Sequence, residues 1–413
     1  NKSILLLEAG PDYPDIDSLP DEVKFGYATG TEISTSDHNW QYIARATDDA
    51  EIDVPRGKVT GGSSAINGQI FLRGIPEDYD NWAEMGNNLW DYQQILPYLN
   101  KIETDTTFQD NPGDFHGNSG PIICHRFPRN TWLPGSNAFE KACLDAGHPY
   151  CEDANAPGST GVGPLPLNNP NGIRWSTAIG YLGLSRHRLN LTIKPNVDVK
   201  KIIFDTNGKC PKAIGVEVVS QGETFFIEGE NIILSAGAVV SPQILMLSGI
   251  GPKTHLSEHN IVTIKDLPGV GQNLADHPML YVTWETKPEI DLDPLGPRIQ
   301  LTLRYTAENS ELENDMIVYM MAVASDRPER GGLRSNPIGM QANLCINLAK
   351  GKGEVKLNSS NYQDQPYLDY NYLEETDDIE RFKHGIKMLV DLEKHPEMEK
   401  MIKKRITPTN QDL

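Results

Sequence analysis

The chain has 413 residues, and its 57 acidic residues outnumber its 37 basic residues, which gives a net charge of -20. This length predicts two closely linked domains. An acidic chain without a basic stripe excludes a nucleic-acid-binding surface. Its sequence contains no apolar run near the ~18 residues that a membrane span needs.

The cysteines match no zinc-binding or redox motif, since they lie at Cys124, Cys143, Cys151, Cys210 and Cys345. This arrangement favours free thiols and therefore a cytoplasmic protein. The chain begins with Asn1, so a targeting segment ahead of this residue stays open.

The first segment, Ser3–Gly10, is an apolar run that ends in an acid and a glycine. It predicts a buried parallel strand. In a dinucleotide-binding unit, the second strand ends in an acid that binds the ribose hydroxyls of adenosine, and Glu8 lies where that acid is expected. The rest of the unit, a strand, a glycine-rich turn and a helix of about 30 residues, is expected ahead of Asn1.

The middle of the chain alternates helical and strand patterns. Helical segments are predicted within Trp82–Glu103, where Pro97 limits their length, and over Asn137–Ala146, with an irregular stretch at 104–136 between them. A strand-rich block follows, at 191–193, 197–204, 213–219, 224–227 and 232–234. Ser241 then predicts an N-cap, with Pro242 at the first helical position and Gly249 closing the helix.

The last part of the chain predicts an antiparallel sheet. Strands are expected over Met279–Thr286, Met316–Ala322 and Met340–Leu348, and the third alternates apolar and other residues, which indicates one buried face. A helix is predicted over Asp378–Lys394, with Thr376 as its N-cap.

The stretch Gly57–Gly74 is rich in glycine and hydroxyl groups. Glycines let a backbone approach a pyrophosphate, and hydroxyls add hydrogen-bond donors without bulk. A flexible glycine turn is the alternative interpretation. A second small-residue turn, Ser235-Ala-Gly-Ala238, leads into the predicted helix, and alone it would indicate only a strand-to-helix connection.

Taken together, the motifs Gly57–Gly74 and Gly237–Gly251 resemble the two signature motifs of the glucose–methanol–choline (GMC) oxidoreductases, which are FAD enzymes that oxidise alcohols. The resemblance implies an α/β fold (α+β overall), with a Rossmann-like FAD-binding domain and a second domain built on an antiparallel sheet. The implied ranges are 1–103 and 170–278 for the FAD-binding domain, 104–169 for a loop or lid insertion, and 279–413 for the substrate-binding domain.

The resemblance also implies which residues bind the cofactor. They are Glu8, Val59, Gly61, Gly62, Ser63, Asn67, Gly68, Gln69, Ile70, Val199, Ala236, Gly237 and His277. Some relatives attach the flavin to a histidine just before the asparagine; Ile66 stands there, so we predict non-covalent FAD. His277 belongs to the motif Asn273–His277, and a purely structural role is its alternative. The segments Asp37–Tyr42 and Arg174–Ala178 are interpreted as scaffold.

The implied reaction moves a hydride from an alcohol to the flavin, which then reduces oxygen or another acceptor. The resemblance places the catalytic histidine beyond Leu413, so no catalytic residue is named in this chain, and the isolated chain is expected neither to hold FAD well nor to turn over. No metal is expected: His255–His259 spells a zinc-protease pattern, but a further ligand and a long helix are missing. A hydroxynitrile lyase of the same fold and a non-catalytic binding protein are the alternatives.

Overall fold

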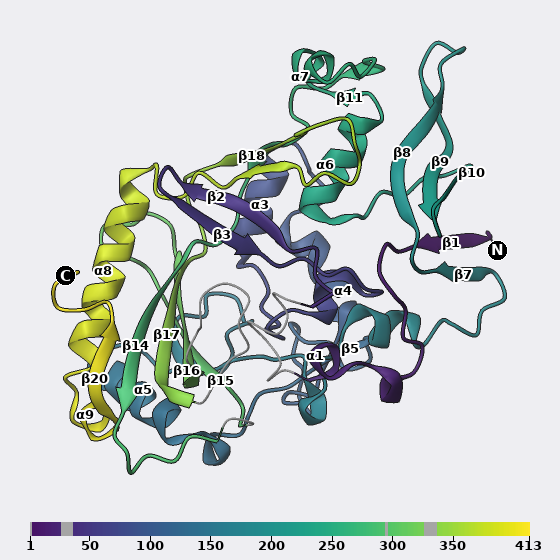
Figure 1. Ribbon diagram of the computed structural model, residues 1–413. Helices are drawn as coiled ribbons and strands as arrows, with labels where there is room; N and C mark the ends of the chain where they lie inside the picture. Colours follow the sequence, from purple (N-terminus) through teal and green to yellow (C-terminus); the bar gives the residue numbers. More distant parts are fainter. Residues whose placement is uncertain (1, 26–35, 294–295, 326–336) are drawn as a thin grey trace.

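The computed structural model describes residues 2–25, 36–293, 296–325 and 337–413. Figure 1 shows a large sheet with its helices at one end of the molecule, and strands β1 and β7 to β10 at the other end. Between these ends lie a second sheet and helix α6.

The largest sheet has six antiparallel strands. In spatial order they are β20 (Ile402–Thr407), β14 (Met279–Thr286), β17 (Pro337–Ile346), β16 (Met316–Ser325), β15 (Ile299–Tyr305) and β6 (Gly161–Pro164). Helices α5 (Pro134–Asp145), α8 (Thr376–Leu392) and α9 (Pro396–Met401) pack on one face, where Met340, Ala342 and Leu344 join the main apolar core. Each large side chain buried there stabilises the fold by about 1.5–3 kcal/mol.

A mixed five-stranded sheet adjoins helix α6 (Gly237–Leu247). Its strands, in spatial order, are β13 (Gln272–Leu274), β18 (Gly353–Lys356), β19 (Tyr367–Asp369), β2 (Tyr42–Thr47) and β3 (Ala50–Val54). Residues from both ends of the chain therefore share one sheet. Beyond α6 lie helix α7 (Lys253–Glu258) and the short parallel pair β11 (Ile250–Gly251) and β12 (Lys265–Asp266).

The part of the chain with a Rossmann-like pattern begins with β1 (Ile4–Leu7), which pairs in parallel with β7 (Leu191–Lys194). An antiparallel meander follows, made of β8 (Asp198–Asp205), β9 (Lys212–Ser220) and β10 (Glu223–Glu228). The N-terminal strand was expected to be parallel, and it is. Its predicted burial is wrong, because Ile4 and Leu5 are 53% and 43% exposed. Among the described residues, the sheet contains only β1 and β7, so no further strand covers these side chains.

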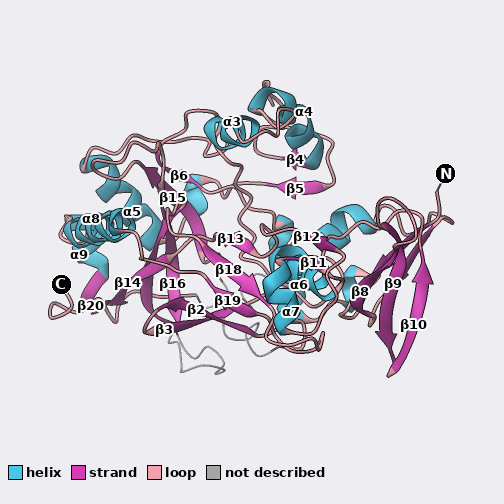
Figure 2. Cartoon of the chain, turned by 90° about the horizontal axis from the view of Figure 1, so that it is seen from above, coloured by secondary structure: helices cyan, strands magenta, loops and turns pink. Residues whose placement is uncertain are grey.

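Figure 2 shows α3 (Pro76–Glu84) and α4 (Tyr92–Ile102) together with the parallel pair β4 (Glu103–Asp105) and β5 (Ile122–Cys124), on one side of the molecule. Shorter elements complete the described chain: helix α1 (Asp21–Lys24), the 3-10 turns η1 (Ile16–Ser18), η3 (Gly62–Ala65), η4 (Arg129–Thr131) and η5 (Pro170–Gly172), and the π-helical turn η6 (Ala178–Leu182).

Four local predictions differ from the structure. Helix α4 continues through Pro97, and α6 begins at Gly237 instead of Ser241, with Pro242 inside it. Residues 232–234 form no strand. Strand β17 is buried on both faces, since Gln341, Asn343 and Cys345 are enclosed as well. Local propensity describes such positions poorly, because the surrounding fold also decides them.

Candidate functional site

The stretch Gly57–Gly74, called the cofactor loop below, packs closely against the end of strand β1. A Cβ atom built on Gly10 would lie 1.9 Å from the carbonyl oxygen of Lys58. A Cβ on Gly57 would lie 2.2 Å from the carbonyl oxygen of Gly62. Since no side chain fits at these distances, only glycine allows the loop to meet the chain at Gly10 and to fold back on itself at Gly57.

The opposite side of the cofactor loop is open. Gly61 and Gly62 have φ angles of 100° and 56°, and a Cβ on Gly62 or on Gly68 would meet nothing within 4 Å. Ser63 and Asn67 are exposed, whereas Val59 is buried and anchors the loop. The result is a strip of main chain without bulky side chains, which suits a flat, phosphate-bearing ligand.

Glu8 lies beside this strip, at the end of β1. Its carboxylate accepts a hydrogen bond from the nitrogen of Gly10 at 2.8 Å. Burial raises the pKa of Glu8, although that hydrogen bond and the charge of Lys58 act in the opposite direction. The nitrogen of Val197 donates to the carbonyl oxygen of Glu8 at 2.9 Å, which brings the start of β8, with the partly buried Val199, next to β1.

The start of α6 is a second open position. Ala236 and Gly237 are exposed, Gly237 has a φ angle of 84°, and a Cβ there would meet nothing within 4 Å. Farther along, Val240 and Ile244 pack in the same apolar cluster as Leu7 of β1 and Val199 of β8. The helix that carries Gly237 is thus fixed to the strands that carry Glu8 and Val199.

His277 is exposed and follows Asp276, whose carboxylate forms an ion pair with Arg56 at 3.2 Å. Arg56 immediately precedes the cofactor loop. The segment that carries His277 therefore lies at the beginning of this loop. Within the described residues, the only polar contact of the His277 ring is with the neighbouring carboxylate of Asp276, at 3.8 Å, and this contact defines no role for the histidine.

The second half of the cofactor loop is bound by residues 166–169. Gln69 is buried with a φ angle of 64°, and its carbonyl oxygen accepts from the nitrogen of Asn168 at 2.9 Å. Ile70 forms a β-bridge with Leu167, and the nitrogen of Phe71 donates to Pro166 at 2.9 Å. These contacts hold Gln69 and Ile70 in one register.

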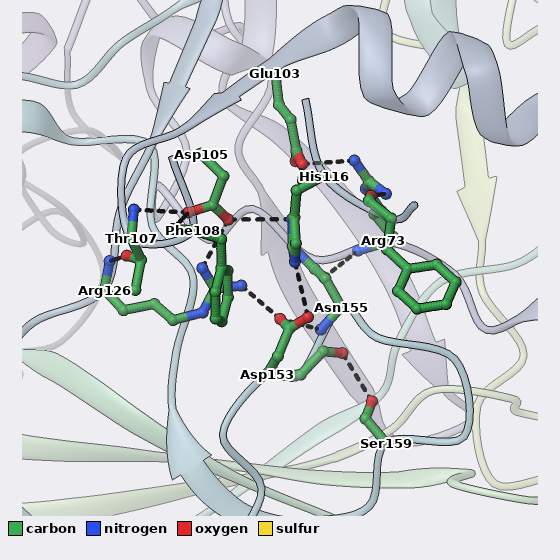
Figure 3. A network of polar contacts seen from close by, with 12 residues as sticks. Arg73, Glu103, Asp105, Thr107, Phe108, His116, Arg126, Asp153, Asn155 and Ser159 are labelled. Carbon is green, nitrogen blue, oxygen red and sulfur yellow. Dashed lines mark hydrogen bonds and ion pairs between the residues drawn. The ribbon is translucent and has the colours of Figure 1, made fainter. Parts of the chain in front are cut away.

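From sequence, Arg174 is interpreted as scaffold. In the structure, its side chain binds the main chain of the cofactor loop. Its guanidinium donates to the carbonyl oxygens of Ala65 and Asn67 at 3.0 and 2.9 Å, and to those of Glu22 and Val23 at 2.8 and 2.7 Å. Burial lowers the pKa of Arg174 to about 10. The residues that sequence reasoning missed altogether are Asn155 and the buried charged groups around Arg73, shown in Figure 3, because no local motif marks them.

The zinc-like pattern at His255–His259 lies on the six-residue helix α7. Nε2 of His255 accepts a hydrogen bond from the nitrogen of Leu357 at 2.9 Å, and Nδ1 lies 3.4 Å from Glu258. Both ring nitrogens already have protein partners, so this histidine has no nitrogen left for a metal.

The residues present fit FAD. Two stretches of main chain, at Gly62–Ser63 and at Ala236–Gly237, are free of bulky side chains, and a carboxylate stands at the end of the parallel strand, as the resemblance requires. In the described part of the chain, no helix is both long and apolar enough to cross a membrane.

Comparison with known proteins gives the family. Residues 29–279 match the model of the GMC oxidoreductases. The chain is 34% identical over 391 residues to an uncharacterised GMC-type oxidoreductase of Rhodococcus erythropolis, covering 94% of this chain and 74% of that protein. It is 32% identical over 433 residues to oxygen-dependent choline dehydrogenase 1 of Chromohalobacter salexigens, covering 98% and 75%.

Solved structures show the same fold. Pyridoxine 4-oxidase from Mesorbium loti matches with a TM-score of 0.85 at 24% identity, covering 98% of this chain and 78% of that one. A formate oxidase matches with a TM-score of 0.85 at 23% identity, covering 98% and 79%. The chain therefore belongs to the GMC oxidoreductase family, the FAD-dependent oxidoreductases that act on the CH–OH group of their donors.

Proposed function

We propose that FAD binds along the cofactor loop of this chain and that the enzyme oxidises an alcohol with it. The observation that carries the proposal is the pair of open main-chain positions at Gly62 and Gly68, on a loop that packs against the strand end carrying Glu8. The proposed ligand residues are Glu8, Val59, Gly61, Gly62, Ser63, Asn67, Gly68, Gln69, Ile70, Val199, Ala236, Gly237 and His277.

Bound FAD supplies a hydride acceptor. The role of this chain is to hold the FAD. Main-chain groups of the cofactor loop face its phosphates and ring, Glu8 faces the ribose, and buried Val59 keeps the loop in place. We propose non-covalent binding, because Ile66, at the position of the flavin-linking histidine in some relatives, is a buried aliphatic side chain without a nucleophile. Flavin that stays with the protein after acid precipitation would contradict this.

We propose that the alcohol binds over the six-stranded sheet, on the face turned away from the helices. Register places Tyr281, Asn343, Tyr319 and Thr302 in one row across four strands. The next row holds Thr283, Gln341 and Met321. Hydroxyl and amide groups of this kind can exchange hydrogen bonds with an alcohol.

This polar face leads toward the cofactor loop. Strand β15 pairs with β6, the chain continues to Leu165, whose nitrogen donates to Gln300 at 3.0 Å, and Pro166 accepts from Phe71 of the loop. We propose the domain division as 1–103 and 170–278 for FAD binding, 279–413 for substrate binding and 104–169 as a loop or lid insertion. Strands nevertheless pair across these boundaries: β18 with β13, β19 with β2, and β6 with β15. All five cysteines are free, and we propose the cytoplasm as the compartment.

The test is anaerobic mixing of the FAD-loaded enzyme with a panel of alcohols, choline included because relatives named choline dehydrogenase are similar to this chain. Bleaching of the flavin absorbance supports alcohol oxidation. A flavin that stays oxidised while a cyanohydrin is cleaved would instead favour the lyase alternative. Readmitting oxygen or an artificial acceptor then identifies the electron acceptor.

A further inference from the structure

The end of the cofactor loop is bound by one buried side chain. Oδ1 of Asn155 accepts a hydrogen bond from the nitrogen of Arg73 at 2.9 Å, and Nδ2 of Asn155 donates to the carbonyl oxygen of Phe71 at 3.0 Å. Asn155 is only 6% exposed. A single amide thus fixes the main chain on both sides of Leu72, directly after the residues proposed to face the flavin.

Asn155 is held in turn by a chain of charged groups (Figure 3). Its own nitrogen donates to Oδ1 of Asp153 at 3.0 Å, and Oδ2 of Asp153 lies 2.9 Å from Nε2 of His116. Nδ1 of His116 lies 2.9 Å from Oε1 of Glu103, and the same oxygen is 2.7 Å from Nη2 of Arg73. These contacts form a closed circuit that starts at the side chain of Arg73 and returns to its main chain.

The five residues of this circuit, Arg73, Glu103, His116, Asp153 and Asn155, belong to three separate stretches of chain. Two further residues join this circuit to form a larger cluster: Arg126 binds Asp105 at 2.7 Å and Asp153 at 2.6 Å. The ring of Phe108 stacks on His116, with centroids 4.7 Å apart.

Glu103, Asp105 and His116 have the spacing of metal ligands, but the charges argue against a metal. Three carboxylates face two guanidinium groups and an imidazole whose two nitrogens each contact a carboxylate, so the protonated imidazole makes the cluster neutral. A divalent cation would have to displace arginines that are almost fully buried. The cluster is therefore balanced in charge without one, although Oε2 of Glu103 and Nε of Arg126 have no hydrogen-bond partner among the described residues.

We propose that the closed circuit of Arg73, Glu103, His116, Asp153 and Asn155 is a positioning device, which sets the Asn67–Ile70 end of the cofactor loop against the reactive ring of the flavin. The proposal rests on the proposed function. Its physical basis is that the buried hydrogen bonds and ion pairs of the circuit allow few alternative geometries of the loop, whereas the rate of hydride transfer falls about 100-fold for a displacement of ~1 Å. The proposed role of the circuit residues is positioning, because the contacts that close the circuit join these residues to one another and to the main chain of the loop.

The experiment compares three variants of the FAD-loaded enzyme. Asn155→Ala removes both loop contacts, and His116→Gln opens the circuit on its far side. The control is Asp378→Asn, which weakens another buried ionic cluster, in which Arg381 of α8 binds Asp378 of the same helix and Asp315. Each variant is measured for Tm, for the visible circular dichroism of the flavin, for flavin reduction at saturating alcohol, and, without flavin, for hydrogen exchange over residues 67–73.

The expected result for Asn155→Ala and His116→Gln is faster exchange over 67–73, an altered flavin spectrum, and flavin reduction slowed about 10- to 100-fold with a smaller change in KM. The control should lower Tm comparably and leave those three quantities as in the wild type. Exchange and spectra that match the control would overturn the proposal. If no alcohol reduces the wild-type flavin, the proposed function fails instead, and exchange and spectra still decide on the circuit. If Asn155→Ala does not fold, Asn155→Ser takes its place.

Discussion

Arg174 donates a hydrogen bond from Nε to the carbonyl oxygen of Asn67, 2.9 Å away. The two residues are 107 positions apart in the chain. The same guanidinium also binds the carbonyl of Ala65, so one buried cation fixes both sides of Ile66. All its hydrogen bonds to described residues go to main-chain oxygens, and the charge is therefore used to order backbone.

We expect Arg174→Met to lower the free energy of unfolding by about 3 kcal/mol or more, because four carbonyls in a buried site lose their donor. Urea denaturation measures this. The matched control is Arg188→Met, at an exposed arginine, which should change stability by less than about 0.5 kcal/mol. Equal effects of the two substitutions would show that Arg174 does not organise the loop.

The open strip predicts that substitutions at two glycines have opposite consequences. Gly68→Ala adds a methyl group where nothing lies within 4 Å, so the protein should fold normally. Because that methyl group enters the proposed flavin site, the Kd for FAD should rise by about tenfold, a loss of about 1.4 kcal/mol. Flavin fluorescence titration measures the Kd, and Gly208→Ala, in an exposed turn, is the control.

Gly10→Ala should instead disrupt folding, since its Cβ would meet the backbone at Lys58, which cannot move aside as a side chain does. The predicted readout is loss of the soluble protein or a large fall in Tm. Normal stability of Gly10→Ala would mean that β1 and the cofactor loop are not packed as described.

The circuit around His116 predicts a dependence of stability on pH. Burial by itself lowers the pKa of His116, but hydrogen bonds to Asp153 and Glu103 and the charges of Asp153 and Asp105 outweigh it and raise the pKa from 6.5 to about 9. Since the folded pKa lies above the unfolded value, the stabilisation is complete below about pH 6.5 and is lost as the pH rises through about 9.

Thermal unfolding between about pH 6 and pH 10 tests this dependence through the difference in Tm between the wild type and His116→Gln. The difference should be largest at the acid end of this window and should shrink by several degrees toward the alkaline end. Groups that titrate alike in both proteins shift both Tm values equally, so they do not contribute to the difference in Tm. A difference that stays constant with pH would mean that His116 is not protonated in the folded protein.

The polar face of the six-stranded sheet predicts an effect on substrate binding. Asn343 is buried in the row between Tyr281 and Tyr319, so Asn343→Leu should raise KM for the alcohol by about tenfold, while the Kd for FAD stays nearly unchanged. The control is Leu344→Met on the helix-facing side, a swap that conserves volume. If both variants leave KM unchanged, the alcohol does not bind on this face.

Much of the architecture could be predicted from local patterns. The antiparallel strands at 279–286, 316–325 and 337–346 and the helix at 376–392 lie close to their expected positions, because alternation and helical periodicity are strong over long segments. The predictions at Pro97 and Ser241 were wrong, since both helices continue through a proline. The exposed face of β1 was also not predictable, because burial depends on which strands lie alongside.

The sequence by itself determined the family and the place of the cofactor loop, because glycines at Gly57–Gly74 and Gly237 are required by backbone geometry, which is a local property. Only the tertiary structure decided how that loop is held. Arg174, Asn155 and His116 reach it from distant stretches, and a single arginine, asparagine or histidine in a sequence does not reveal its partners. Buried polar groups must find hydrogen-bond partners wherever the fold brings them, and the fold placed these around the end of the loop.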